Sequence, residues 1–178
     1  MKLINTTMDG VFILENFKMN DSRGEFVKIF HKNLFSESKL CNNFSESYFS
    51  VSHKDVIRGM HFQLPPHDHE KLVFVAKGAI LDVVVDLRKN SKTYQHYIVV
   101  ELSETNRHSL YIPKGCAHGF KSLEDGTITV YNVGTVYNSE FDCGILYDSF
   151  GFNWEIENPI ISDRDRGFRT LEEFKSPF

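Results

Sequence analysis

The sequence predicts an all-β protein of the jelly-roll type, built as a double sheet or a small barrel. Short segments rich in β-branched and aromatic residues recur between turn residues along most of the chain. No sustained helical periodicity is found before the C-terminal tail. Strands at this spacing are typical of sandwiches and barrels. A chain of 178 residues suits one domain, which we expect to span residues 1–178.

The first part of the chain predicts strands at residues 10–16 and 25–31, with a polar turn between them. Residues 32–44 predict a short helix or an irregular loop, for which Ser36 is the candidate cap. Residues 47–51 alternate weakly between apolar and polar side chains and predict a further strand.

The centre of the chain contains the strongest strand signal. Residues 71–76 and 79–87 are dominated by β-branched and apolar side chains, and Gly78 supplies the tight turn between them. The tail predicts one or two helical turns at residues 169–174. The remaining predicted strands are residues 97–102, 109–113, 118–123 and 126–133.

Cationic and imidazole side chains gather where the chain enters this central hairpin. Such groups are poorly suited to a core and well suited to the mouth of a barrel. We expect a second cluster, residues 111–120, to face them. The first group consists of Arg58, His61, His67, His69 and Lys71.

The composition is that of a soluble globular protein, with 41% hydrophobic and 25% charged residues. A net charge of -4 gives no reason to expect binding to nucleic acid or to acidic membranes. Cys41, Cys116 and Cys143 are widely spaced, so we interpret them as reduced thiols. The N-terminal segment resembles neither a signal peptide nor a membrane span. We therefore expect a cytoplasmic protein.

A two-part pattern of histidines and glycines resembles the signature of the cupin barrel, in which a metal sits in the mouth. Pro113, Gly115 and His118 match the second part of the pattern. In the first part, Lys71 stands where the metal-binding glutamate would be, and Pro65 replaces the first histidine. A lysine ammonium has no lone pair and repels a divalent ion. We therefore expect a cupin barrel without a metal, with His67 and His69 as residues of a surface loop.

A longer set of segments is similar to the dTDP-4-dehydrorhamnose 3,5-epimerase family. The resemblance covers nearly the whole chain, from Arg23 to Asp165. It implies a metal-free cupin jelly roll that needs no cofactor, takes a nucleotide-sugar substrate and forms homodimers, commonly by exchange of N-terminal strands. The matching segments are residues 58–63, 71–94, 101–125 and 161–165, together with the pair Tyr131 and Tyr137.

The resemblance also implies catalytic roles, and each suits the chemistry of its residue. Epimerisation beside a ketone requires a base, a group that holds the enolate and an acid on the opposite face. His61 matches the family base, and Asp165 matches the carboxylate that orients it, with Asp163 as the alternative. Lys71 would stabilise the oxyanion, and Tyr131 would deliver the proton from the other face.

Other candidate residues would bind the substrate. Arg58 and His118 would contact the sugar or the diphosphate, and Gln63 would support His61 from the same strand face. Tyr137 is either a residue of the active site or only a packing residue. Asp82 and Asp86 are interpreted as structural or rim groups, since carboxylates repel diphosphate.

Residues expected at the nucleotide depart from the family pattern. Arg23 and Phe26 match the family's nucleotide-binding segment, but Lys28 stands at its glutamate position. Glu46 and Tyr48 replace the usual glutamine and asparagine of the nucleotide-facing wall. These changes suggest a carrier other than dTDP, with GDP the natural candidate and a 4-keto-6-deoxy-heptose as a possible sugar.

Three other functions remain open at this point. A 3,4-ketoisomerase on the same barrel would carry a further histidine where this chain has Phe62 and Gln63. A metal-dependent cupin isomerase or oxygenase would use the histidines as ligands, which Lys71 disfavours. A non-catalytic sugar-binding cupin would tolerate the loss of His61 or Tyr131, yet both are present.

Overall fold

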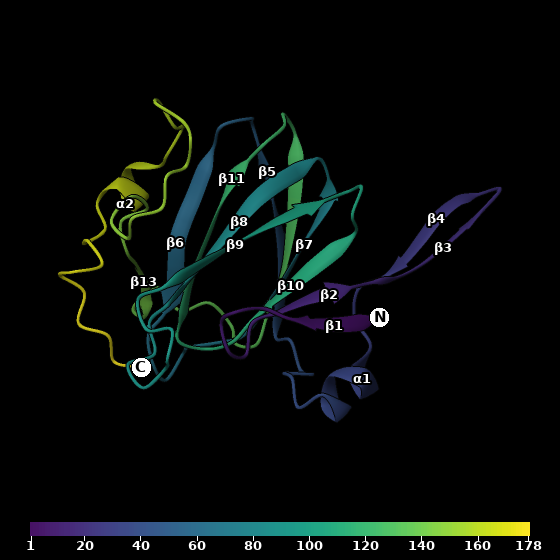
Figure 1. Ribbon diagram of the computed structural model, residues 1–178, viewed down its shortest axis with the longest axis horizontal. Coiled ribbons are helices and arrows are strands. Elements are labelled where there is room, and N and C mark those ends of the chain that lie inside the picture. Colours follow the sequence, from purple (N-terminus) through teal and green to yellow (C-terminus); the bar gives the residue numbers. More distant parts are fainter.

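Two antiparallel sheets form the body of the computed structural model, which describes residues 1–178 (Figure 1). They confirm the predicted all-β double sheet. In order, the strands of the six-stranded sheet are β1 (Lys2–Asn5), β2 (Phe12–Glu15), β10 (His108–Ile112), β7 (Lys71–Lys77), β12 (Thr127–Val133) and β5 (Glu46–Ser52). Those of the five-stranded sheet are β13 (Asp142–Gly144), β6 (Ile57–Gln63), β11 (Cys116–Ser122), β8 (Ala79–Asp86) and β9 (Tyr97–Ser103).

A separate hairpin, formed by β3 (Phe17–Asp21) and β4 (Gly24–Lys28), projects away from these sheets (Figure 1). Every residue of β3 is exposed, including Phe17 and Met19. Phe26 on β4 is also 57% exposed. Large apolar side chains rarely gather on a free hairpin unless another surface covers them.

Alternation along the five-stranded sheet separates its two faces. On β8, Ile80 and Val84 point into the cluster between the sheets, whereas Val83 and Val85 pack on the outer face. On β6, Met60 and Phe62 likewise pack on the outer face. The intervening positions of β6 therefore face the space between the sheets, and this directs His61 inward.

Two hydrophobic clusters hold the sheets in place. The inner cluster joins both sheets through side chains such as Val73, Leu110 and Phe120. The outer cluster is covered by the C-terminal segment, in which Trp154 and Leu171 are buried against the sheet. Complete burial of one such side chain stabilises the fold by about 1.5–3 kcal/mol. In Figure 1 this segment, coloured yellow-green to yellow, lies along β6 and β13.

The turn between β7 and β8 shows why a glycine is needed there. Gly78 has a φ of 77°, in the left-handed region that glycine favours. A Cβ atom at this position would lie 2.5 Å from Thr127 Oγ1. The turn predicted at Gly78 is confirmed.

Several local predictions were wrong. Helix α1 (Lys32–Glu37) is capped by His31, whose Nδ1 accepts from the Leu34 amide, and Ser36 lies inside the helix. The C-terminal helix is α2 (Asp163–Arg166), capped by Ser162, while residues 169–174 contain only a turn at 171–173 and an isolated bridge from Arg169 to Ile145. Strands β1, β3 and β13 were not predicted. None of the helices is long and apolar enough to cross a membrane.

Candidate active site

A cavity of about 580 Å³ opens between the two sheets. It contains polar side chains from both of them and from the loops at one end of the barrel. The lining residues are Glu46, Tyr48, Ser50, Arg58, His61, Phe62, Gln63, His69, Lys71, His118, Phe120, Tyr131, Val133, Tyr137, Asp142 and Arg164.

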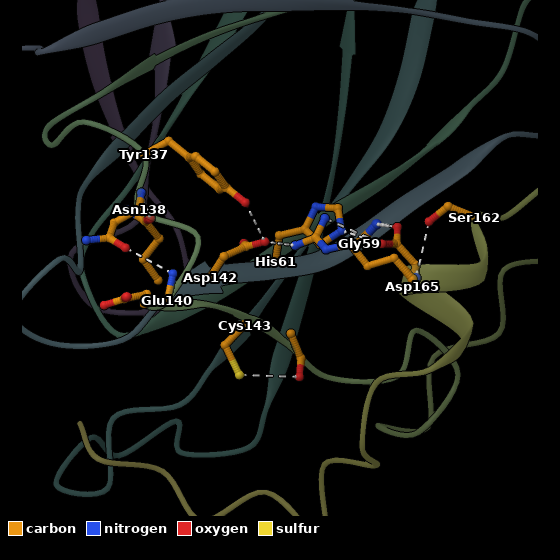
Figure 2. Close-up of polar contacts among 12 residues, drawn as sticks. Gly59, His61, Tyr137, Asn138, Glu140, Asp142, Cys143, Ser162 and Asp165 are labelled. Atoms are coloured by element: carbon orange, nitrogen blue, oxygen red, sulfur yellow. Dashed lines mark hydrogen bonds and ion pairs between the residues drawn. The ribbon is translucent and has the colours of Figure 1, made fainter.

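His61 and Asp165 form a hydrogen-bonded pair at this cavity. His61 Nε2 lies 2.9 Å from Asp165 Oδ1 (Figure 2). The other carboxylate oxygen, Oδ2, accepts from the Gly59 amide at 3.1 Å. Ser162 caps α2 by accepting from the Asp165 amide, which fixes the start of the helix. Asp165 is thus the aspartate that contacts His61, while Asp163 is exposed.

The protonation of this pair suits a base. Burial lowers the pKa of His61, against the hydrogen bond and charge of Asp165, so the imidazole is neutral at pH 7. Burial acts to raise the pKa of Asp165, but His61 and the Gly59 amide together hold it below its usual value. An ionised Asp165 accepts the proton on Nε2. The lone pair of His61 is therefore on Nδ1, which makes no hydrogen bond within the protein.

Two glycines allow β6 and β11 to approach closely beside His61. A Cβ atom on Gly59 would lie 2.5 Å from the Cα of Gly119. Gly59 also has a φ of 143°, which side chains rarely adopt. The register between the strands shifts here, next to the pair His61 and His118. This irregularity gives the Gly59 amide its position beside Asp165.

Lys71 begins β7 and is buried, with only 7% of its surface exposed. Its Nζ donates to the His61 carbonyl oxygen at 3.0 Å. Burial lowers the pKa of Lys71 to about 8, against the attraction of Asp82 and Asp142. The ammonium form still predominates at pH 7 and has N–H groups available for an oxygen in the cavity.

His118 lies beside His61 on the neighbouring strand and is almost fully buried. Its Nε2 lies 2.8 Å from Asp82 Oδ2, and Asp82 has no exposed surface. Asp86 is equally buried and accepts from Arg88 at 2.8 Å. Of the two predicted roles for these aspartates, the rim role was wrong, because both lie inside the fold and hold neighbouring side chains.

Tyr131 approaches the cavity from the opposite sheet. It lies on β12, is 8% exposed, and stacks on Tyr48 with ring centroids 4.9 Å apart. Burial raises the pKa of its phenol well above the usual value, although its hydroxyl lies 3.5 Å from Ser50 Oγ. The phenol therefore keeps its proton and faces the cavity from the side across from β6.

A chain of polar contacts at the cavity was not predicted. Tyr137 donates to Asp142 Oδ2 at 3.3 Å, and Arg164 donates to the same oxygen at 2.5 Å. Figure 2 shows Tyr137 and Asp142 on one side of His61 and Asp165 on the other. Arg164 also approaches Asp165 to 3.8 Å. Arg164 belongs to the matched segment 161–165, which was a usable signal, whereas nothing in the sequence pointed to Asp142.

The other predicted binding residues divide into two groups. Arg58, Gln63 and Glu46 line the cavity. The predicted support of His61 by Gln63 was wrong, because the Gln63 side chain bonds to the His67 carbonyl oxygen and the His69 ring and not to His61. His69 also lines it, so its assignment to a surface loop was wrong. His67 does not line the cavity, and its ring packs on Phe141 with centroids 4.5 Å apart.

Arg23, Phe26 and Lys28 lie on the projecting hairpin and do not line the cavity of their own chain. Arg23 bonds to Asp21 at 2.6 Å, and Lys28 lies 5.9 Å from the centre of the Phe17 ring. Within one chain, the structure does not bring these residues to the site.

No three side chains among His, Cys, Asp and Glu are grouped closely enough to hold a metal ion. At the position of the cupin glutamate, the cavity presents the ammonium of Lys71. An ammonium supplies protons and positive charge but no lone pair.

The chain matches known proteins over almost its full length. The family model described as dTDP-4-dehydrorhamnose 3,5-epimerase matches residues 5–173. The chain is 41% identical over 177 residues to the enzyme of that name from Methanothermobacter thermautotrophicus, covering 97% of this chain and 95% of the relative. It is 36% identical to the one from Escherichia coli, over 97% of this chain and 96% of the relative.

Solved structures of enzymes from this family also superpose on the chain over almost its full length. The Bacillus anthracis enzyme, crystallised with TDP and PPi, superposes with a TM-score of 0.92 at 36% identity, over 96% of this chain and 99% of that one. The Legionella pneumophila enzyme in complex with dTDP-4-keto-L-rhamnose gives a TM-score of 0.92 at 31% identity, over 98% and 94%. The chain therefore belongs to the dTDP-4-dehydrorhamnose 3,5-epimerase family and is an isomerase of the carbohydrate-epimerase type.

Proposed function

We propose that this protein epimerises a dTDP-linked 4-keto-6-deoxy sugar at C3 and C5 in cytoplasmic deoxysugar biosynthesis. One observation carries the proposal. The neutral base His61 and the protonated phenol Tyr131 reach the same cavity from opposite sheets. A sugar bound between them has one face toward a proton acceptor and the other toward a proton donor.

The first step is proton removal. His61 Nδ1 takes the proton from the carbon beside the C4 ketone. The electron pair of that C–H bond forms the C=C bond of the enolate, and the π pair of the ketone moves to the C4 oxygen. Asp165 stabilises the imidazolium that forms, through the 2.9 Å hydrogen bond at Nε2. The Lys71 ammonium is placed next to His61 and stabilises the developing enolate oxygen.

The second step is proton return. The Tyr131 hydroxyl gives its proton to the opposite face of the same carbon, and the C4 ketone is restored. The phenolate then takes a proton from water, and the His61 imidazolium releases its proton to water. The raised pKa of Tyr131 keeps its phenol protonated until the enolate forms. The same two groups serve C3 and C5 in turn if the ring is rebound or flips in the cavity.

The carrier is proposed to be dTDP. Relatives in this family were crystallised with TDP or with dTDP-sugars. The hypothesis of a GDP-linked heptose depended on Lys28, Glu46 and Tyr48, and none of these relatives supports it. Glu46 and Tyr48 do line the cavity, so they remain the residues to examine for carrier preference.

A homodimer is proposed to complete the nucleotide end of the site. Arg23, Phe26 and Lys28 lie on a hairpin that projects from its own chain and carries exposed apolar side chains. The outer strand β5 also exposes Phe49 and Val51. Exchange of the hairpin between two chains would cover these surfaces. Light scattering should give twice the mass of the chain, and a monomer that is fully active would contradict this proposal.

Solvent-deuterium incorporation tests the proposed reaction directly. Purified protein in heavy water is mixed with dTDP-4-keto-6-deoxyglucose or its GDP-linked counterpart, and NMR follows C3 and C5. We expect deuterium at both centres of the dTDP substrate and inversion there. Deuterium at C3 alone would identify a 3-epimerase, a GDP preference would restore the alternative carrier, and no exchange at all would refute the proposal.

A further inference from the structure

The histidine at position 69 has a fixed orientation that the catalytic steps above do not use. Its ring lines the cavity, and its Nδ1 is turned toward Thr135 Oγ1 at 2.8 Å and Gln63 Nε2 at 3.1 Å. Nε2 makes no hydrogen bond within the protein, so it is the ring nitrogen left for a ligand.

The contacts of Gln63 determine which nitrogen of His69 carries the proton. Gln63 Oε1 accepts from the Asn138 amide at 2.7 Å, and Gln63 Nε2 donates to the His67 carbonyl oxygen at 3.0 Å. A backbone N–H only donates and a carbonyl only accepts, so the side-chain amide cannot be flipped. Its Nε2 therefore presents a donor to His69, and Nδ1 of His69 must accept.

The Thr135 hydroxyl is compatible with this assignment. It lies within 3.0 Å of the His67 carbonyl oxygen and 2.8 Å of His69 Nδ1, and it donates to either. With Nδ1 as the acceptor, the proton of the neutral ring is on Nε2. Burial, with Lys71 and Lys114 nearby, lowers the pKa of His69 to about 3, so the ring stays neutral.

We propose that His69 is a substrate-positioning residue that donates a hydrogen bond from Nε2 to an uncharged oxygen of the sugar, a hydroxyl or the ketone. This inference rests on the proposed function and deepens it. Arg58, Lys71 and Arg164 supply the positive charge in the cavity. A neutral donor orients the sugar without adding to that charge, which suits a sugar oxygen better than a diphosphate.

The tautomer is measured first, without any substrate. Long-range proton–nitrogen NMR of uniformly labelled protein distinguishes the two ring nitrogens, and the His69 signals are those lost in His69→Gln. We expect a protonated Nε2 and an unprotonated Nδ1. A ring protonated at Nδ1 would overturn the proposal.

Binding then tests the contact with the sugar. Calorimetry compares dTDP alone with the dTDP-linked reaction product for wild type, His69→Leu, His69→Gln and His67→Gln. Loss of one hydrogen bond to a ligand weakens binding by about tenfold. We expect that loss in His69→Leu for the sugar nucleotide only, with dTDP itself bound normally. The amide donor of His69→Gln should restore most of the affinity, and His67→Gln, on the same loop but outside the cavity, should behave as wild type.

The outcomes separate the two proposals. Equal weakening of dTDP and of the sugar nucleotide in His69→Leu would indicate a structural lesion and would overturn the positioning role. Unchanged affinity for the sugar nucleotide in His69→Leu would overturn it as well. A wild-type protein that neither binds nor exchanges the dTDP-linked sugar would refute the proposed function, and the assignment of the sugar to His69 with it.

Discussion

Replacement of Asp165 by asparagine tests the proposed catalytic pair of His61 and Asp165 most directly, because it changes charge and hydrogen bonding with almost no change of shape. The carboxylate now serves two donors, His61 Nε2 at 2.9 Å and the Gly59 amide at 3.1 Å. An asparagine has a single oxygen for both. If that oxygen keeps Gly59, the amide nitrogen faces His61, and the proton of the imidazole moves to Nδ1. The lone pair is then turned away from the cavity.

The magnitude follows from the charge that Asp165 supplies. Two unit charges about 4 Å apart attract by about 4 kcal/mol at the effective dielectric constant of a protein site. This attraction is absent while His61 is neutral and present once it has taken the substrate proton, so its loss raises the barrier. A barrier higher by about 4 kcal/mol slows the reaction by about 10³-fold. We therefore expect Asp165→Asn to lower the rate of deuterium exchange by about that factor.

The assay is deuterium incorporation under single-turnover conditions, with Asp163→Asn as the matched control. Asp163 lies in the same short helix but is exposed and does not touch His61. Asp165 also raises the pKa of His61, so Asp165→Asn should move the acidic limb of kcat/KM to lower pH. A rate within tenfold of wild type, or an equal loss in Asp163→Asn, would refute this account of the pair.

Three further predictions concern the remaining groups. His61→Ala should abolish exchange at both centres while dTDP binding by calorimetry stays within about threefold; continued exchange would exclude His61 as the base. Tyr131→Phe should still incorporate deuterium at the first centre but should slow inversion there, as measured by NMR on the same samples. Normal inversion would indicate that another group is the acid. Lys71→Met should lower kcat by about 10²–10³-fold. In wild type, kcat should fall as pH rises through about 8, where Lys71 loses its proton; an alkaline limb that survives in Lys71→Met would belong to another group.

The sequence predicted the parts of the fold that depend on local patterns. The β-branched and apolar residues within 71–87 and the glycine between the two strands were sufficient to place β7 and β8. Strand β13 is only three residues long and exists because it pairs with β6, far away in the chain. A pairing partner at that distance leaves no local signal, so β13 could not be predicted.

The site was predictable to the extent that its residues lie in matched segments. His61, Lys71 and Tyr131 do, and all of them line one cavity. The position of His69 depends instead on Gln63 and Thr135, which hold the ring in place from two other parts of the chain. The surface-loop position had been inferred from the metal-ligand pattern that Lys71 interrupts, and that pattern gave no indication that the ring still faces the cavity.

The placement of the proposed base and acid on two different sheets has a consequence for the interior of the protein. His61 and Tyr131 are carried by different sheets, and the packing of side chains such as Val73, Leu110 and Phe120 between those sheets helps to set their spacing. A core substitution that spreads the layers would leave each catalytic group intact yet lengthen the path across the sugar. Such a variant would exchange protons with water but return them to the face from which they came. The ratio of inversion to exchange should therefore fall as the distance between the two sheets increases. The stereochemical fidelity of the reaction thus depends in part on the hydrophobic core.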